Sequence, residues 1–292
     1  MKILVLYGSK PSKNSKELIE AAENMGHTVY AGPTADISSS ISNDGSKFWL
    51  GKVDISDIDL CLLRSFGPGS TEQSTRRISM LEHMEITGIK MVNSTYPFRR
   101  SRDKYATQYI LHDAGIPIPS TYTTESLARA YQKTGEMKDV IYKPILSSMG
   151  RGSMKFTDQD LAYNAYRLLD RLQHPLILQK YVENPGRDIR VFIIGDKVVG
   201  SVYKYIPEGQ WKSNVAQGGK MVEEKMSDEI IEMAFNATRA MGLDYAGVDL
   251  LESKEGPSVL EVNASPGWQG LKGATGKDVA ELIVDYGVKQ VE

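Results

Sequence analysis

The sequence predicts an α/β region with a parallel sheet, followed by α+β regions with antiparallel sheets. In the first third of the chain, short apolar strand patterns alternate with helical patterns, as in a parallel sheet with crossover helices. After residue 140 the strand patterns come in pairs separated by turns, which indicates antiparallel hairpins. Because 292 residues exceed what one hydrophobic core usually serves, we expect two or three subdomains with a ligand-binding cleft between them.

The first region begins with an apolar strand and an amphipathic helix. Ser15 can cap this helix, whose apolar positions repeat at helical spacing until the chain reaches Gly26. Further strands and one long helix continue the alternation. The expected strands are residues 2–7, 28–31, 60–63 and 90–93, and the long helix is residues 71–86.

A helix over residues 103–114, which carries Lys104, leads into the second part of the chain. The glycine and two prolines of residues 115–119 end this helix and mark a boundary region. Helices over residues 160–172 and 227–241 separate three hairpins. The hairpin strands are residues 140–145 with 153–156, 190–194 with 198–203, and 248–252 with 258–262. We therefore divide the chain into residues 1–96, 97–182 and 183–292.

The composition is typical of a soluble enzyme. With 41% hydrophobic residues, 25% charged residues and a net charge of -2, the chain gives no reason to expect a nucleic-acid partner. The one cysteine, Cys61, lies in an apolar run and is expected to be a buried strand residue of a protein in a reducing cytosol. The apolar N-terminal run is too short to span a membrane and lacks a cleavage site. We expect a cytoplasmic protein without a membrane partner.

The strongest group of candidate functional residues lies in the last hairpin. Folding about the turn at residues 254–257 brings Asp249 close to Glu261 and Asn263, and strand alternation puts Glu261 and Asn263 on one face. Two carboxylates and an amide oxygen suit a hard cation such as Mg²⁺, which often completes its shell with substrate phosphates. The alternative is a solvated strand face that carries acidic residues by chance.

A second group combines a strand lysine with a glycine-rich turn. Lys143 ends a strand that leads into the small residues 147–152. Glycines let backbone amides approach an anion closely, and a lysine supplies positive charge for a polyphosphate. The segment is not a Walker loop, because no GK[ST] follows at the required spacing. A plain hairpin is the alternative interpretation.

A third group is formed by Asp188 and Arg190, which share one face of a strand. The two residues could make ordinary cross-strand ion pairs. An arginine beside a phosphate-binding loop could instead stabilise a phosphoryl group during its transfer.

Taken in order, these stretches resemble the RimK-type branch of the ATP-grasp superfamily, from about Asn93 to the C-terminus. The N-terminal third matches only in its pattern of elements. The motifs that carry the resemblance are Asp103-Lys104, Tyr142-Lys143-Pro144, the glycine-rich turn, Gln179-Lys180-Tyr181-Val182, residues 186–192 (GRDIRVF), Ser213-Asn214, Gln217-Gly218-Gly219, residues 246–249 (AGVD) and residues 261–267 (EVNASPG).

The resemblance implies an ATP-grasp fold and a role for each matching residue. Lys104 and Lys143 would contact the nucleotide, Gln179, Lys180, Tyr181 and Val182 would form the hinge that holds adenine, and Asp188 would accept the ribose hydroxyls. Asp249, Glu261 and Asn263 would hold two Mg²⁺ or Mn²⁺ ions. Arg190 and Asn214, with Lys212 and Ser213, would face the transferred phosphate.

The implied reaction is ATP-dependent joining of a carboxylate to an amine. A free carboxylate is a poor electrophile, so ATP first converts it to an acyl phosphate, which the amine of a second substrate then attacks. The glycine-rich turn is expected to close over the intermediate and exclude water.

Enzymes of this branch differ in their acceptors, and glutamate is the amine in several of them. Residues 67–81 look most like the group that joins glutamate to tetrahydromethanopterin. Alternative acceptors are a protein C-terminus, the deazaflavin coenzyme and the carrier protein of lysine biosynthesis, which would receive α-aminoadipate. The carrier-protein alternative is weakened by Ser213-Asn214 and by the sequence Asn263-Ala264-Ser265-Pro266-Gly267.

Two other classes of function stay open at this point. A nucleotide-binding module without turnover is one, although it would not need both carboxylates and the amide. Carboxyphosphate chemistry is the other, but it would be expected in a longer chain.

Three arginines and two tryptophans are candidates for binding the acceptor. Arg64, Arg76 and Arg77 could bind an acceptor carboxylate or be ordinary surface charges, and Trp211 and Trp268 could stack on a ring or pack between domains. Related enzymes are commonly dimers or tetramers, so we expect a homo-oligomer.

Overall fold

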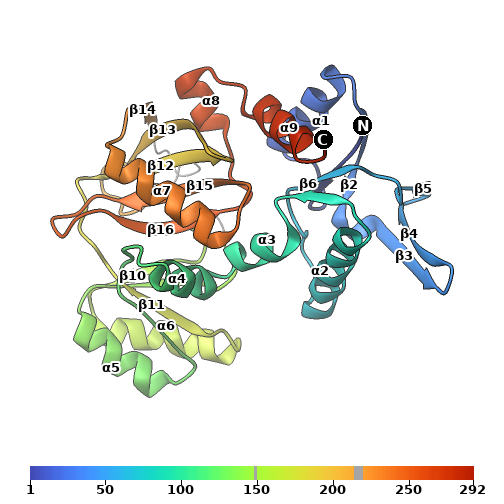
Figure 1. Cartoon of the computed structure of the whole chain (residues 1–292). Helices are drawn as coiled ribbons and strands as arrows, with labels where there is room; N and C mark the ends of the chain where they lie inside the picture. The colour runs from blue at the N-terminus through green and yellow to red at the C-terminus, as the bar shows by residue number, and fades with distance from the viewer. Residues whose placement is uncertain (148–149, 214–219) are drawn as a thin grey trace.

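The computed structural model describes residues 1–147, 150–213 and 220–292, and within these ranges the strands form four sheets. Figure 1 shows the N-terminal sheet on one side of the molecule and two antiparallel sheets on the other, with helix α3 (Thr95–Arg102) between the two sides. The alternation of parallel and antiparallel regions agrees with the fold class predicted from the sequence. The boundaries proposed near residues 96 and 182 stay predictions.

The N-terminal sheet is parallel, with strand order β2-β1-β6-β7. Strands β1 and β6 are buried along nearly their whole length, as expected for a parallel sheet that is covered on both faces. Cys61 lies in β6 and is fully buried, as predicted. The strand bounds are β1 (Lys2–Tyr7), β2 (Thr28–Pro33), β6 (Leu60–Leu63) and β7 (Lys90–Val92).

Helices from both ends of the chain cover this sheet. Helices α1 (Lys13–Asn24) and α9 (Val279–Lys289) pack on one face, where Leu18 and Ile283 meet strand residues. Helix α2 (Thr71–Ile86) packs on the other face through Leu81 and its neighbours. The last helix therefore belongs to the same core as the first strand, and Figure 1 shows the two termini close together.

The N-cap of α1 differs from the sequence prediction. Helix α1 begins at Lys13, and Ser12 is its N-cap, with the Ser12 hydroxyl accepting from the Ser15 backbone N–H at 3.1 Å. Ser15, predicted as the cap, is instead a buried helical residue. The earlier start adds a turn of backbone hydrogen bonds, beginning with Lys16 N to Ser12 O at 3.0 Å.

A small antiparallel sheet follows β2 and was not predicted from the sequence. It projects from the N-terminal sheet (Figure 1), and its first strand carries a run of exposed serines that lacks the usual apolar alternation. Its elements are η1 (Thr34–Asp36), β3 (Ile37–Ser42), β4 (Gly45–Leu50) and β5 (Val53–Asp54).

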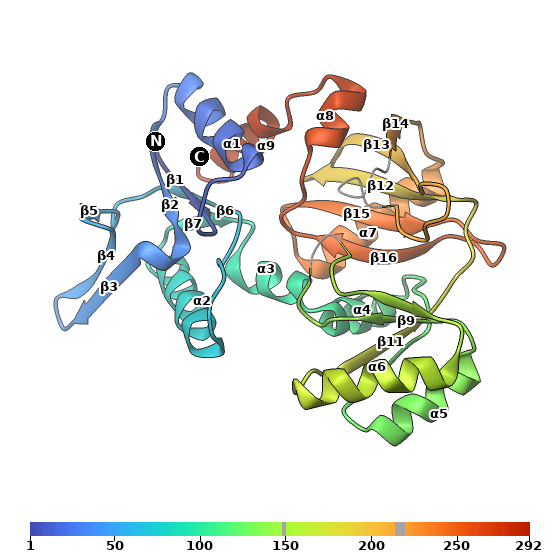
Figure 2. The ribbon, with the colours of Figure 1, turned by 180° about the vertical axis from the view of Figure 1, so that it is seen from behind.

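The middle sheet has the order β10-β9-β11-β8 and is antiparallel throughout. Helices α5 and α6 cover one of its faces, as Figure 2 shows, and bury Tyr142 and Tyr166 between helices and sheet. The predicted pairing of the strand at Val140 with the strand that ends at Phe156 is confirmed. The bounds are β8 (Thr121–Thr124), α5 (Leu127–Met137), β9 (Val140–Lys143), β10 (Met154–Phe156), α6 (Gln159–Arg171) and β11 (Leu176–Lys180).

The C-terminal sheet has the order β14-β13-β12-β15-β16 and contains the other two predicted hairpins. Helix α7 covers its apolar face through Ile230 and Ala234, while the opposite face looks toward the middle sheet. The bounds are β12 (Arg187–Ile194), β13 (Lys197–Tyr205), β14 (Lys220–Glu223), α7 (Asp228–Met241), β15 (Tyr245–Leu251), β16 (Ser258–Asn263) and α8 (Gln269–Thr275).

Asn93 connects the N-terminal sheet to the C-terminal sheet. This fully buried residue follows β7 and donates to the carbonyl oxygens of Tyr245 at 2.9 Å and Ala264 at 2.8 Å. Its side-chain amide oxygen, Oδ1, accepts from the backbone N–H groups of Asp244 and Tyr245. Both donors and both acceptor positions of its side-chain amide are thus used by backbone groups at the start of β15 and just after β16, which lie far away in the sequence.

After Asn93, helix α3 leads into helix α4 (Lys104–Asp113). The carboxylate of Asp103 caps α4 by accepting from the backbone N–H groups of Tyr105 and Ala106. This cap fixes the orientation of Lys104, the first residue of the helix. None of the helices described in the structure is long and apolar enough to cross a membrane.

Candidate active site

A pocket lies between the middle sheet and the C-terminal sheet, and most of the predicted site residues line it. Residues from β9, β11, β12, β15 and β16 contribute, so the pocket depends on how the two sheets face each other. The predicted residues that line it are Lys104, Lys143, Gln179, Lys180, Tyr181, Val182, Asp188, Lys212, Ser213, Asp249 and Glu261.

Asp249 and Glu261 are direct cross-strand neighbours in the β15–β16 pairing. Asn263 lies on the same face, and its amide nitrogen is 3.4 Å from a carboxylate oxygen of Asp249. The three side chains come together as predicted, but the pairing shifts register between Asp249 and Leu250, and this shift, not strand alternation alone, places Asp249 opposite Glu261. Within the described ranges no three acidic, histidine or cysteine side chains lie together so that they could hold a metal ion; this set has two carboxylates and one amide.

Two cations hold the carboxylate of Asp249. Arg190 approaches it with two nitrogens, at 2.9 and 2.5 Å, and the Lys204 ammonium group lies at 2.7 Å. Burial alone would raise the pKa of Asp249, but these cations outweigh it and lower the pKa to about 2. Asp249 is thus ionised throughout the neutral range and carries the charge that a divalent cation requires.

The contact between Arg190 and Asp249 is the cross-strand ion pair that the sequence interpretation had given as an alternative. Arg190 is directly opposite Asp249 in the β12–β15 pairing. Its charge nevertheless lies at the pocket, because Asp249 itself lines the pocket wall.

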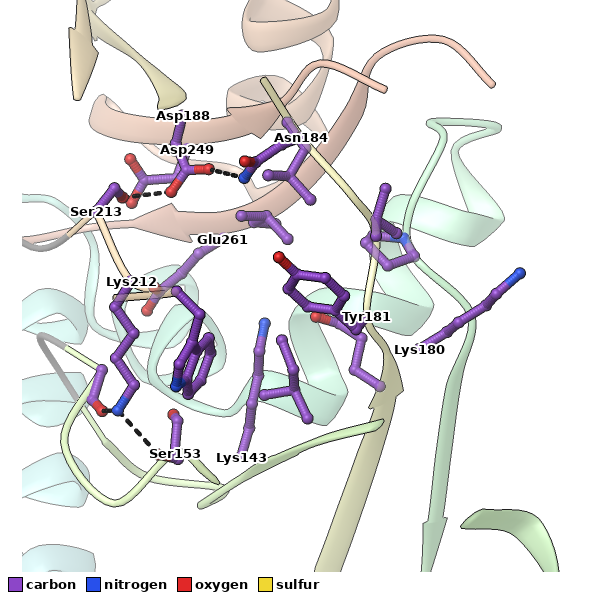
Figure 3. A pocket seen from close by; sticks show the side chains of 18 of the residues that line it. Lys143, Ser153, Lys180, Tyr181, Asn184, Asp188, Lys212, Ser213, Asp249 and Glu261 are labelled. Atoms are coloured by element: carbon purple, nitrogen blue, oxygen red, sulfur yellow. Dashed lines mark hydrogen bonds between the residues drawn. The ribbon is translucent and has the colours of Figure 1, made fainter. Parts of the chain in front are cut away.

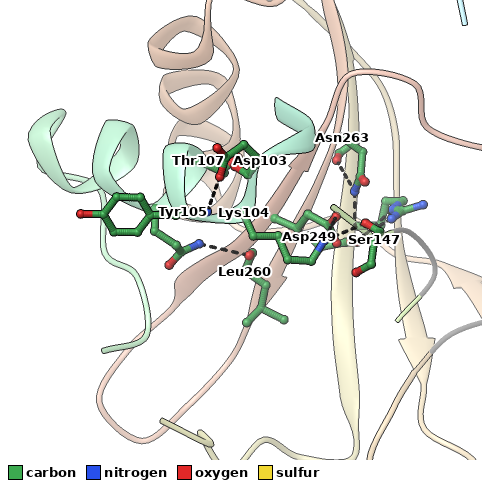
Figure 4. A network of polar contacts seen from close by, with 12 residues as sticks. Asp103, Lys104, Tyr105, Thr107, Ser147, Asp249, Leu260 and Asn263 are labelled. Carbon is green, nitrogen blue, oxygen red and sulfur yellow. Dashed lines mark hydrogen bonds and ion pairs between the residues drawn. The ribbon is translucent and has the colours of Figure 1, made fainter. Parts of the chain in front are cut away.

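Lys104 and Lys143 bring further positive charge close to Glu261. The Lys104 ammonium group lies 3.5 Å from a Glu261 carboxylate oxygen and donates to the Ser147 carbonyl oxygen at 2.8 Å, as Figure 4 shows for the surroundings of Lys104. Burial lowers the pKa of Lys143 to about 8, against the opposing effect of Glu261. Lys143 is therefore a lysine whose charge can be lost near neutral pH.

Asp188 lies at the far wall of the pocket from Lys143 and is bound by neutral donors. The Asn184 amide donates to it at 3.0 Å, and the Ser213 hydroxyl also donates to it. Burial raises the pKa of Asp188, partly offset by Lys204. The carboxylate can accept hydrogen bonds from a ligand that enters between these groups.

The segment Gln179–Val182 forms one edge of the pocket, but its side chains point in different directions. The amide of Gln179 is buried and donates to Gln108 at 3.2 Å and Thr121 at 3.0 Å, so only its backbone is available at the pocket. Lys180 is exposed, and Figure 3 shows it extending away from the other labelled residues. Tyr181 lies under the ammonium group of Lys155.

Lys212 lines the pocket and also connects it to the glycine-rich turn. Its ammonium group donates to the carbonyl oxygens of Gly150 at 3.0 Å and Ser153 at 2.8 Å. Asn214 and the motif at residues 217–219 lie outside the described residues, as do residues 148 and 149 of the turn.

Several pocket residues were not found from the sequence. Lys204 is the most important, because it is 5% exposed and contacts Asp249 directly. It stands opposite Asp188 in the β12–β13 pairing, so extending the alternation rule from β12 to its partner strand could have identified it. Three apolar residues that gave no signal in the sequence also line the pocket, namely Ile141, Leu251 and Leu260, and so does Trp211, which the sequence analysis had named as a residue that could stack on a ring.

The three arginines proposed to bind an acceptor make hydrogen bonds to other residues of the protein. Arg76 donates to Ile37 O at 2.8 Å, and Arg77 donates to Phe66 O and Pro68 O. Arg64 donates to the Tyr245 hydroxyl and to Pro266 O and stacks on Trp268. Trp268 is fully buried and donates to Glu17 at 2.7 Å, so it packs between domains.

Comparison with known proteins gives relatives over nearly the whole chain. The model of the RimK-like ATP-grasp domain matches residues 101–286. The chain is 30% identical to a tetrahydromethanopterin:alpha-L-glutamate ligase of Methanosarcina acetivorans, over 86% of each protein. It is 32% identical to a probable alpha-L-glutamate ligase of Methanococcoides burtonii, over 98% of this chain and 95% of the relative.

Solved structures resemble the fold at lower sequence identity. The ATP-grasp ligase PsnB, complexed with a phosphomimetic variant of its minimal precursor, Mg and ADP, has a TM-score of 0.77 and 23% identity, over 99% of this chain and 98% of PsnB. The D-cycloserine synthetase DcsG has a TM-score of 0.76 and 19% identity over the full length of both chains.

Proposed function

The chain belongs to the RimK-like ATP-grasp family and is an ATP-dependent ligase that joins a carboxylate to an amine, and we propose that it adds L-glutamate to tetrahydromethanopterin or a similar cofactor. ATP and Mg²⁺ are the expected co-substrate and metal of such an enzyme. Relatives whose names specify glutamate support the choice of amine. The relative from Methanosarcina acetivorans supports the choice of acceptor.

The observation that carries this proposal is the meeting of Asp249, Glu261 and Asn263 beside four cationic side chains. Carboxylate and amide oxygens are the donors that Mg²⁺ prefers. The cations Lys104, Lys143 and Lys204 line the pocket, and Arg190 binds Asp249. The residues present therefore fit a polyphosphate with divalent ions. We propose two ions, Mg²⁺ or Mn²⁺, with these three side chains as protein ligands.

The other pocket residues have proposed roles in binding the nucleotide. The backbone of Gln179–Val182 and the apolar side chains Ile141, Leu251 and Leu260 would hold adenine, and Asp188 would accept the ribose hydroxyls. Lys143 and Lys104 would neutralise phosphate charge. Arg190 and Lys204 would balance Asp249 and the charge of the transferred group, with Asn214 as a further contact.

In the proposed first step, a carboxylate oxygen of the acceptor attacks the γ-phosphorus of ATP, and ADP leaves. The cationic side chains favour this step because they neutralise the oxygens on which charge develops. Bound Mg²⁺ would supply additional charge neutralisation between the phosphates. In the second step the deprotonated amine of glutamate attacks the acyl carbon, phosphate leaves, and an amide results.

The test is ADP release in the presence of ATP, Mg²⁺ and glutamate, with tetrahydromethanopterin, the deazaflavin coenzyme or a glutamate-terminated peptide as acceptor. The proposal predicts stimulation by tetrahydromethanopterin and a product heavier by one glutamyl unit. Hydroxylamine in place of glutamate should trap the acyl phosphate as a hydroxamate of the same acceptor.

The other arms distinguish the alternatives. Stimulation by the peptide or by the deazaflavin coenzyme alone would replace the proposed acceptor, and α-aminoadipate as the preferred amine would point to a carrier protein. If ADP binds but neither ADP release nor a hydroxamate occurs with any acceptor, the proposed acceptors are excluded.

A further inference from the structure

A second cavity shares Glu261 with the proposed nucleotide pocket. It has a volume of about 320 Å³ and runs between the end of β6, helix α3, the chain after β9 and the end of β16. Glu261 lines both cavities, and Asn263 lines the second one. A ligand in the second cavity would therefore contact two of the proposed metal residues. The volume suits a small ligand or the end of a longer one.

The position of the second cavity in the N-terminal sheet also favours a ligand. Strand β1 pairs with β2 on one side and with β6 on the other, so the chain changes direction across the sheet between β1 and β6. In open α/β sheets, ligands bind outside the carboxyl ends of the strands at such a switch point. Arg64 and Ser65, which follow the carboxyl end of β6 directly, line this cavity.

Arg102 gives the cavity an available positive charge. It is the last residue of α3, its side chain is exposed, and it lines the cavity. Within residues 1–147, 150–213 and 220–292 it makes no hydrogen bond or ion pair, and its guanidinium group only stacks over Phe66 at 5.3 Å. The neighbouring carboxylate of Asp103 is occupied with the cap of α4. Arg102 therefore differs from Arg64, whose terminal nitrogens are bound to Tyr245 and Pro266.

The wall of the cavity offers a further polar atom and an apolar surface. The Ser147 hydroxyl oxygen is buried and has no hydrogen-bond partner in the described part of the chain, while the Ser147 carbonyl oxygen accepts from Lys104 (Figure 4). Phe98 and Leu146 form the apolar part of the lining. This combination suits a ligand with a carboxylate on a short aliphatic chain.

We propose that the second cavity binds the acceptor and that Arg102 holds its carboxylate through charge-assisted hydrogen bonds. This inference rests on the proposed ligase function, because it places the nucleophile of the first step. From this cavity a carboxylate oxygen can attack the γ-phosphorus beside Glu261, with the bond between phosphorus and the bridging oxygen of ADP breaking as the new bond forms.

The test measures binding of a carboxylate probe by calorimetry in the presence of Mg²⁺ and ADP. The probe is N-acetyl-glutamyl-glutamate, and the matching amide compound, N-acetyl-glutaminyl-glutaminamide, is the ligand control. The variants are Arg102→Gln and Arg102→Lys. Arg99→Gln is the protein control, because it removes a positive charge from the same helix at an exposed position that does not line the cavity.

We expect the wild-type protein to bind the carboxylate probe and not the amide. In Arg102→Gln the affinity should fall about 10- to 100-fold, the range expected for a lost hydrogen bond to a charged group. Arg102→Lys should recover part of the affinity, because the charge remains but the forked geometry is lost. Arg99→Gln should bind as the wild type does. Affinity for ADP should be the same in all four proteins.

The outcomes separate this inference from the proposed function. Binding of ADP without binding of the carboxylate probe would overturn the acceptor site and leave the nucleotide site standing. An equal loss of probe affinity in Arg99→Gln and Arg102→Gln would show that the affinity depends only on the net charge of the helix. This result would also overturn the acceptor site. Failure of the wild-type protein to bind ADP would contradict the proposed function itself.

Discussion

The two cavities that meet at Glu261 differ in how their charged groups are bound. In the nucleotide pocket, Asp249 is held by Arg190 and Lys204, and Asp188 by Asn184 and Ser213. In the second cavity, Arg102 has no such partner within the described residues. The charges of the proposed nucleotide pocket are thus held by partners within the protein, whereas the cavity proposed for the acceptor has a cation without such a partner in the described residues.

This difference matches what each cavity would have to recognise. ATP and its metal ions are the same in every enzyme of this kind, so a preorganised set of charges lowers the cost of binding and of the transition state. Acceptors differ among relatives. A guanidinium group without a partner in the described residues can bind the carboxylate of different acceptors, while the other residues of the cavity vary. The following predictions test the contrast, beginning with the largest expected effect.

Glu261→Ala should remove the group that both cavities share. We expect loss of ligase activity by roughly a thousandfold or more, because metal-assisted charge neutralisation provides several kcal/mol in such reactions. The fold should persist, since Glu261 is half-buried and its one ion pair, with Lys104, is 3.5 Å long. Turnover and the circular dichroism spectrum are the measurements.

Glu255→Ala is the matched control for this variant. Glu255 is exposed in the turn of the same hairpin and lines neither cavity. Full activity in Glu261→Ala, or equal loss in both variants, would contradict the placement of Glu261 at the reacting centre.

Asn93→Ala should disturb the second cavity more than the first. Asn93 holds the carbonyl oxygen of Ala264, which lines the second cavity. Loss of its four buried hydrogen bonds should lower the free energy of unfolding by about 2–4 kcal/mol. We also expect a larger rise in KM for the acceptor than for ATP.

Urea unfolding and steady-state kinetics would measure both effects, with Asn236→Ala on the exposed surface of α7 as the control. A variant that unfolds like the wild type would show that these hydrogen bonds do not stabilise the contact between the sheets. A rise confined to the KM for ATP would contradict the assignment of the second cavity to the acceptor.

The pH dependence of binding should differ between the cavities. Burial lowers the pKa of Lys143 to about 8 in the protein without nucleotide, so its charge is present below pH 8 and is lost as the pH rises through that value. If phosphate binding requires the charged form, affinity for ADP should fall roughly tenfold between pH 7 and pH 9. A carboxylate held by Arg102 should show no such fall, because arginine stays protonated.

Lys143→Arg is the control, since it keeps a charge across this range. Calorimetric titrations at several pH values should then show a nearly constant affinity for ADP. An equally steep fall in this variant would assign the pH dependence to another group.

Much of the fold and of the nucleotide pocket could be predicted from the sequence, because both depend on local patterns. The alternation of strands and helices predicted the parallel sheet, and each of the three hairpins pairs as expected. The period of two along β16 predicted that Glu261 and Asn263 share a face, but the register shift between Asp249 and Leu250 that places Asp249 opposite Glu261 was not predicted from the sequence. The N-cap of α1 was misplaced from Ser12 to Ser15, because either serine could accept the necessary hydrogen bond.

The tertiary structure decided which charges remain available and which residues far apart in the sequence meet. Arg64, Arg76 and Arg77 were equal candidates in the sequence, but backbone carbonyl groups bind them, while Arg102 has no hydrogen-bond or ion-pair partner in the part of the chain that the structure describes. Lys204 reaches Asp249 only because three strands are packed side by side. Likewise, the second cavity exists only where β6, α3 and β16 converge. Strand periodicity fixes which face of its own strand a side chain occupies, but the partner it meets depends on how separate sheets pack, and no local pattern carries that information.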